Sequence, residues 1–229
     1  MVKSIGAIVF IGAAFLTYGQ SLLFEKIHLA VLGFIAVIFI RDINLISLIC
    51  ISAIANIVSE LLYPLVMTLD FQITLKVLTY STIILYLIKF REDSLHLSVS
   101  LVIAMCLGAE LYWYVTDSPG AMIYWYALLI NINLLVRYFL FSRVFIMAKY
   151  FPKEYRSLNL DHTLYQVVLL YIVVHELVLM EYVLRWIFDV PSTLVYYAAP
   201  YLFHGLTAYT ALLIYIQGYR LISKNWLKA

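Results

Sequence analysis

Four ionisable side chains lie close together in a strongly apolar stretch, VVHELVLMEYVLRW, between positions 173 and 186. They are His175, Glu176, Glu181 and Arg185. Histidine titrates near neutral pH and acidic side chains attract cations, so these residue types could exchange protons or bind a cation. Glu181 and Arg185 are four residues apart with the acid first, which is the favourable order for an ion pair on a helix. We therefore expect Arg185 to be the counter-ion of Glu181.

The composition indicates that this stretch lies in a membrane. The chain has 229 residues, of which 65% are hydrophobic and 12% charged. A soluble domain is about half apolar and about a quarter charged, so a water-soluble fold of this size could not bury so much apolar surface. A membrane-spanning helix needs roughly 20 mostly apolar residues, so seven or eight such helices would use nearly the whole chain. We predict a single integral membrane domain over 1–229.

Apolar runs separated by turn residues predict eight helices, so the predicted fold class is an all-α polytopic membrane bundle. The second run is short for a span, which leaves seven full spans and one partial helix as the alternative. The first twenty residues also have features of a signal peptide, but we interpret them as the first membrane helix. The predicted ranges are about 4–23, 27–40, 43–66, 71–90, 95–116, 121–148, 163–188 and 193–222.

The basic residues predict the orientation, because cytoplasmic loops carry an excess of Lys and Arg. With eight spans, one side of the membrane holds both termini and the loops near 41–42, 89–94 and 149–162, whereas the other side has only Lys26 in a loop. We therefore place both termini and the 150–162 loop in the cytoplasm, in an inner or plasma membrane. The basic residues on that side are Lys3, Arg41, Lys89, Arg91, Arg143, Lys149, Lys153, Arg156, Arg220, Lys224 and Lys228.

Glutamates lie at two depths in the predicted helices. Glu60, Glu110 and Glu181 lie near the outer turns, whereas His175 and Glu176 lie near the midplane. A charge at the centre of a membrane costs on the order of 3 kcal/mol, and such residues usually face the bundle interior or a watery cavity. Two interpretations remain open. One is an acid-lined cavity, and the other is a network of interhelical hydrogen bonds that contribute about 0.6–2 kcal/mol each.

Two outer turns resemble each other within the chain. Asp117-Ser-Pro and Asp189-Val-Pro each open a turn, and Tyr124 and Tyr196 follow at matching positions. Parallel repeats of helical hairpins occur in some transporters. Chance similarity between turns is the alternative interpretation.

Several enzyme classes lack their signatures in this sequence. The two cysteines, Cys50 and Cys106, fall in apolar runs, and no metal-binding spacing or phosphate-binding loop occurs, so we expect no metal and no cofactor. Glu181 and Arg185 are similar to part of the Glu-Glu-x-x-x-Arg motif of a family of intramembrane proteases. However, position 180 is Met, and the further His-bearing helices of that family are missing, so we reject this similarity. An intramembrane enzyme is the less favoured class.

The leading hypothesis is a channel or transporter for a cation, a proton or a small cationic solute. Glu60, Glu110 and Glu181 would attract the solute, and the deeper His175 and Glu176 would exchange protons.

The competing hypothesis is a sensor or anchor subunit that docks a cytoplasmic protein through the 150–162 loop, with Lys153 and Arg156 at the contact. In either case we expect a homo-oligomer or a subunit of a membrane complex. The lipid bilayer is a partner, and no nucleic acid is expected.

Overall fold

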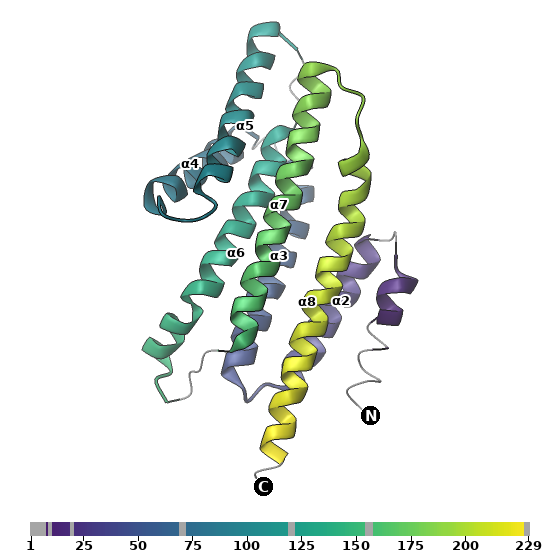
Figure 1. Cartoon of the computed structure of the whole chain (residues 1–229), viewed down its shortest axis with the longest axis vertical. Coiled ribbons are helices and arrows are strands. Elements are labelled where there is room, and N and C mark those ends of the chain that lie inside the picture. Colours follow the sequence, from purple (N-terminus) through teal and green to yellow (C-terminus); the bar gives the residue numbers. More distant parts are fainter. Residues whose placement is uncertain are drawn as a thin grey trace. The chain divides into compact units, whose positions relative to one another are not determined.

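Helices make up all of the regular secondary structure in the described part of the chain. The computed structural model describes residues 8, 11–18, 21–68, 72–118, 122–153 and 158–226. A short helix covers 11–16, and the all-α prediction is confirmed. The longer helices are α2 (Ser21–Ile38), α3 (Ile43–Thr68), α4 (Gln72–Lys89), α5 (His96–Thr116), α6 (Ile123–Tyr150), α7 (Asn159–Phe188) and α8 (Leu194–Trp226) (Figure 1).

Four of these helices are long and apolar enough to cross a membrane: α5, α6, α7 and the Leu194–Arg220 part of α8. The 30 residues of α7 rise about 45 Å, which exceeds the hydrocarbon thickness of about 30 Å. Four spans in the described part of the chain are fewer than the eight or seven that the sequence predicts. Two further helices contain apolar segments: α2 has 18 residues and includes Lys26–Ile38, and α3 has 26 residues and includes Ile43–Val58. In α4, Lys76 and several Thr and Ser residues interrupt the apolar sequence.

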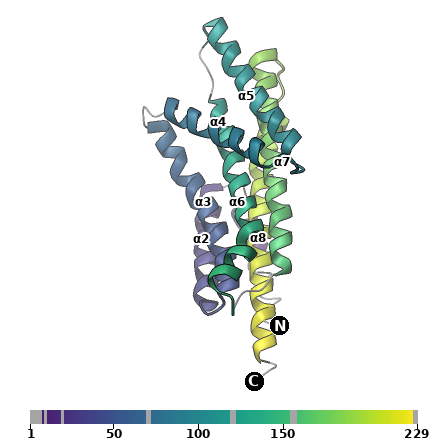
Figure 2. The same ribbon diagram turned by 90° about the vertical axis from the view of Figure 1, so that its left-hand side faces the viewer.

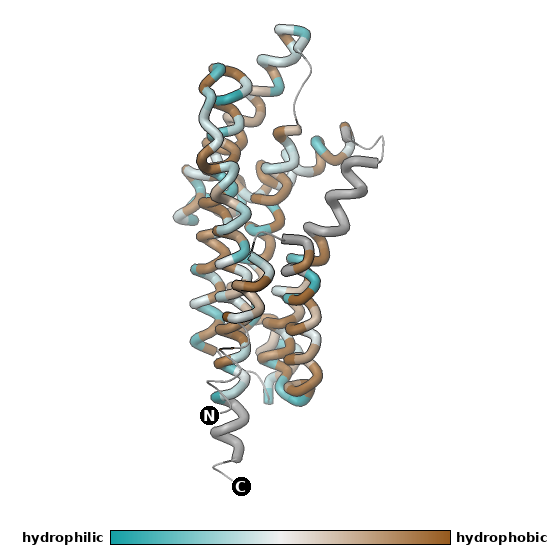
Figure 3. The backbone as a smooth tube through the Cα atoms, turned by 90° about the vertical axis from the view of Figure 1, so that its right-hand side faces the viewer, coloured by the Kyte–Doolittle hydropathy of each residue, from teal (hydrophilic) through white to brown (hydrophobic). Residues whose placement is uncertain are grey.

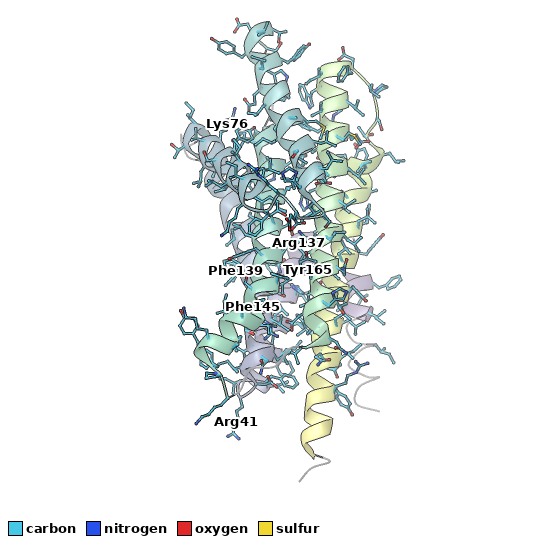
Figure 4. The ribbon with its side chains drawn as sticks, turned by 60° about the vertical axis from the view of Figure 1, so that its left-hand side comes forward. Arg41, Lys76, Arg137, Phe139, Phe145 and Tyr165 are labelled. Carbon is cyan, nitrogen blue, oxygen red and sulfur yellow. The ribbon has the colours of Figure 1, made fainter. Side chains whose placement is uncertain are left out.

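The exposed side chains of the long helices suit lipid. On α5, the large residues Leu97, Leu101 and Leu111 are exposed, whereas the smaller Cys106 and Ala109 are buried. On α6, Phe139 and Phe145 are exposed (Figure 4). Hydrophobic residues continue along most of each helix (Figure 3). Helices that cross a bilayer need apolar side chains on their outer surface, because that surface contacts hydrocarbon. The buried residues of α5 also include the larger Val99 and Trp113.

Aspartates mark several helix ends. The Asp42 carboxylate accepts hydrogen bonds from the backbone N–H groups of Asn44 and Leu45, at 3.1 and 3.2 Å, and so caps the start of α3. Asp117 and Asp189 adopt the left-handed conformation, with φ of 49° and 52°, directly after α5 and α7. Asp tolerates this conformation better than most residues, so it can end a helix without glycine.

The two similar turns agree in backbone conformation and differ in packing. Asp117 and Asp189 share the left-handed conformation, as just described. However, Tyr124 is 1% exposed and Tyr196 is 45% exposed. A parallel hairpin repeat therefore stays a prediction.

The chain forms two compact units, each assembled from separate segments. Unit 1 comprises Met1–Ile57, Leu135–Tyr171 and Pro200–Ala229, and unit 2 comprises Val58–Leu134 and Ile172–Ala199. In unit 1, α7 and α8 lie side by side (Figure 1). The Tyr171 hydroxyl lies 2.5 Å from the Thr207 hydroxyl, and the Tyr171 and Phe203 rings stack at 5.7 Å.

Unit 2 contains Glu110, the acidic residue of α5, and Glu176 and Glu181 of α7. Within it, α4 packs against α5 (Figure 2). The Asn131 amide of α6 donates a hydrogen bond to the Thr82 hydroxyl of α4. The Tyr126 and Tyr182 rings join α6 to α7 at 5.3 Å. The candidate site residues below are placed by these packed helices.

Candidate functional site

Glu110 is held by two side chains of α4. Its Oε2 atom lies 2.8 Å from the Lys76 Nζ atom, and the Tyr80 hydroxyl donates to its Oε1 atom at 3.4 Å. The Lys76 and Glu110 side chains are 30% and 26% exposed. The sequence suggests that a lysine near a helix end extends toward the headgroups. In the structure the Lys76 ammonium instead binds the carboxylate of Glu110, which lies 34 positions away in the chain.

Aromatic and sulfur groups surround this pair. The Lys76 Nζ atom lies 5.2 Å from the centroid of the Tyr124 ring, within the range of a cation–π interaction. The Tyr124 hydroxyl and the buried Cys106 thiol are close enough to the Glu110 carboxylate to interact with it electrostatically. Tyr80 and Leu75 pack against the buried Tyr124. The structure thus brings α4, α5 and α6 together around Glu110.

Glu176 has a different environment. It lies in the interior of α7, about 18 Å along the helix from Phe188, and the Ser98 hydroxyl of α5 donates a hydrogen bond to its Oε1 atom. Its side chain is half-buried. Among the described residues, no basic side chain forms an ion pair with it. The adjacent His175 is 8% exposed and therefore buried.

Glu181 caps the start of α8. Its Oε1 atom accepts hydrogen bonds from the Ser192 hydroxyl at 2.8 Å and the Val195 backbone N–H at 3.1 Å. Its Oε2 atom accepts one from the Tyr196 backbone N–H at 2.6 Å. A carboxylate at a helix N-terminus satisfies N–H groups that have no partner within the helix. Both oxygens of Glu181 are thus used to hold α8, and the residue is 5% exposed.

Arg185 lies beside aromatic rings. Its guanidinium carbon is 5.7 Å from the Tyr182 ring centroid and 5.4 Å from that of Tyr196. Within the described residues, no ion pair within 4 Å joins it to Glu181, although its positive charge still favours the charged Glu181 carboxylate. The carboxylate instead binds the backbone of α8, which sequence spacing along one helix could not reveal.

Glu60, Lys153 and Arg156 are the other residues that the two functional hypotheses named. The Glu60 side chain and Arg156 lie outside the described residues. Lys153 is exposed, in the segment between α6 and α7. That segment is shorter than the predicted 150–162 loop, since α6 extends to Tyr150 and α7 begins at Asn159.

A buried ion pair in unit 1 was not predicted. Arg143 of α6 donates from Nε to Asp161 Oδ1 at 2.6 Å and from Nη2 to Asp161 Oδ2 at 2.5 Å. Its Nη1 atom also reaches the Ser47 hydroxyl at 3.2 Å. Arg143 is only 2% exposed. The signal available in the sequence was an arginine inside an apolar run, which positive-inside counting assigned to the cytoplasmic side.

A second buried arginine in unit 1 packs on an aromatic ring. The Arg137 guanidinium carbon lies 4.3 Å from the centroid of the Tyr165 ring (Figure 4). Arg137 is 5% exposed, so it does not extend to the membrane surface as its position in the sequence suggests. The stacked ring lowers the cost of burying a weakly hydrated guanidinium.

The fold and these contacts define an α-helical membrane protein with charged groups paired inside. Among the described residues, no three His, Cys, Asp or Glu side chains come together as a metal site would need. Comparison with known protein families, curated proteins and solved structures found no match.

Proposed function

We propose that the protein is a multi-pass channel or transporter for a cation, a proton or a small cationic solute. Glu176 carries this proposal. It is an acid deep in the most apolar of the four long helices, and the hydroxyl of Ser98 is its hydrogen-bond partner. A carboxyl group at such depth without a basic partner can be neutralised by a proton or by a passing cation.

The remaining acids have different parts in this proposal. Glu110 would bind the solute near the outer end of the predicted membrane helices. The sequence places Glu60 at a comparable distance from that end. His175, next to Glu176, would share in proton exchange. The hydrogen bonds of Glu181 favour a role in holding α8 rather than in binding the solute. Arg185 would then keep its aromatic contacts and position the same turn.

We also propose that the protein lies in an inner or plasma membrane with both termini in the cytoplasm. The distribution of Lys and Arg between the predicted loops supports this orientation. A reporter that is active only in the cytoplasm should be active when it is fused to either terminus. Activity of a periplasmic or extracellular reporter at one terminus would contradict it.

Flux into liposomes tests the proposed function. Purified protein should carry protons or monovalent cations down a gradient, and Glu176→Gln should lower the flux at least about tenfold, because the amide can accept the Ser98 hydrogen bond but cannot release a proton. Glu92→Gln is the matched control, since Glu92 is exposed between α4 and α5. Equal flux through the wild type and Glu176→Gln would contradict the role of Glu176.

The alternative function is a sensor or anchor that docks a cytoplasmic protein. It is favoured by the exposure of Tyr150, Phe151 and Lys153, which lie together at the end of α6 and just after it. Purification in mild detergent should then recover a stoichiometric soluble partner, and replacing Lys153 and Arg156 with Glu should release it. Oligomerisation is expected under either function and can be measured by light scattering in detergent.

A further inference from the structure

The strongest unexplained feature of unit 2 is the set of side chains around the Lys76 ammonium. We call Lys76, Tyr80, Glu110 and Tyr124 the amine cluster. The ammonium lies 2.8 Å from a Glu110 oxygen and 5.2 Å from the centroid of the Tyr124 ring. A carboxylate combined with an aromatic face is a typical environment for binding an organic cation.

The chemistry of the amine cluster suits an alkylammonium better than a metal ion. Calcium takes six to eight oxygen ligands and magnesium takes six in near-octahedral geometry. The cluster offers the two oxygens of Glu110 and the hydroxyls of Tyr80 and Tyr124. An ammonium has three N–H donors and tolerates an aromatic neighbour, so these groups can satisfy it.

The cluster also has an unused hydrogen-bonding group. The Tyr124 hydroxyl is buried and has no hydrogen-bond partner among the described residues, and the residue is 1% exposed. It interacts electrostatically with both the Glu110 carboxylate and the Tyr80 hydroxyl, so it belongs to the same cluster. A buried hydroxyl without a hydrogen-bond partner is unfavourable, because it has lost its contacts with water. A free primary ammonium could direct one of its three N–H donors to this hydroxyl, because no tether fixes its orientation.

We propose that Glu110, Tyr80 and Tyr124 form a binding site for a small primary alkylammonium, and that Lys76 is a tethered occupant that competes with it. This inference rests on the proposed function, because it names the class of solute. Lys76 differs from the buried Arg143 in that its side chain is 30% exposed, whereas that of Arg143 is 2% exposed. Its flexible side chain can therefore leave Glu110 when a solute amine arrives.

The tether sets the expected affinity. A group attached by a short flexible chain competes as if it were present at millimolar concentration. A free amine must exceed this concentration to displace Lys76. Removing the tethered ammonium should therefore raise the apparent affinity for a free amine about tenfold, provided that Glu110 remains.

Binding to the purified full-length chain in detergent tests the site. Isothermal titration with n-propylammonium chloride should give an affinity at least about tenfold higher for Lys76→Ala than for the wild type. Sodium chloride at equal ionic strength should show no such gain. Lys89→Ala is the matched control, because Lys89 lies in the last turn of the same helix. Equal affinity in Lys76→Ala and in Lys76→Ala with Glu110→Gln would overturn the proposal.

A second variant covers the case in which Lys76→Ala does not fold. Lys76→Gln keeps a hydrogen-bonding group beside Glu110 and removes the charge, so it should also bind propylammonium more tightly than the wild type. No gain in this variant would count against the site.

Flux of methylammonium, protons or sodium into liposomes separates the proposed amine site from the proposed transport function. Propylammonium binding without any cation flux would overturn transport and leave the site standing. Flux of protons or sodium without amine binding in either Lys76 variant would overturn the site and leave transport standing.

Discussion

Replacing Arg143 with methionine should lower the free energy of unfolding by about 3–5 kcal/mol. The structure sets this magnitude. Two hydrogen bonds of 2.6 and 2.5 Å join the guanidinium to Asp161, whose side chain is 12% exposed against 2% for Arg143. Removing Arg143 leaves the Asp161 carboxylate without its charged partner in a nearly dry environment. An exposed ion pair would contribute at most about 1 kcal/mol, so the two cases are well separated.

The assay is unfolding in mixed micelles by titration with sodium dodecyl sulfate, followed by circular dichroism. Lys149→Met is the matched control, since it removes an exposed basic residue from the last turn of the same helix. Its free energy of unfolding should change by less than about 0.5 kcal/mol. A change of less than about 1 kcal/mol for Arg143→Met would refute the argument that this pair is buried and well formed.

A double variant tests the physical reason. Arg143→Met combined with Asp161→Leu leaves no unpaired charge, so it should recover much of the stability that Arg143→Met alone loses. Asp161 also accepts a hydrogen bond from the Leu158 backbone N–H at 2.8 Å, so part of the loss at the start of α7 should remain. If the double variant is less stable than Arg143→Met by the full cost of Asp161→Leu alone, the two residues do not interact.

Three other replacements have expected outcomes in the same unfolding assay. Glu181→Ala should cost about 2 kcal/mol, because three hydrogen bonds that hold the start of α8 are lost; no change would show that the cap is not formed. Gly218→Ala should cost about 1–3 kcal/mol, because a Cβ atom there would lie 2.6 Å from the Phe39 ring. Gly205→Ala is its control, since a Cβ atom at that position meets nothing within 4 Å, and equal effects would contradict this reasoning. Asn131→Leu should cost about 0.6–2 kcal/mol through loss of its hydrogen bond to α4, and a gain in stability would indicate that the bond is absent.

The sequence was a good guide to the positions of the helices. Polar turn residues such as Asp42, Asp117 and Asp189 separate apolar runs, and each of these aspartates lies at a helix end in the structure. These features are local, because capping and helix length depend on residues near each other in the chain. Fewer helices in the described part of the chain have the length and composition of a span than the sequence predicts; α2 and α4 have 18 residues each, and Lys76 interrupts the apolar sequence of α4.

The partners of the charged residues could not be predicted in the same way. Sequence spacing suggested that Glu181 pairs with Arg185 along one helix, whereas the carboxylate binds backbone N–H groups of the next helix. Neither the ion pair between Lys76 and Glu110 nor the one between Arg143 and Asp161 could be read from the sequence, because each joins two helices.

The sequence by itself indicated that lipid surrounds this protein, that its fold is helical, and where its helices end. In lipid the backbone must satisfy its hydrogen bonds internally, and continuous apolar runs of about 20 residues indicate that it does so along helices. Only the tertiary structure decided which acids are neutralised by basic residues, which cap helices and which, like Glu176, meet a hydroxyl. The physical reason is that electrostatic energy depends on distances between atoms, and the ion pairs described here join residues 18 to 34 positions apart in the chain.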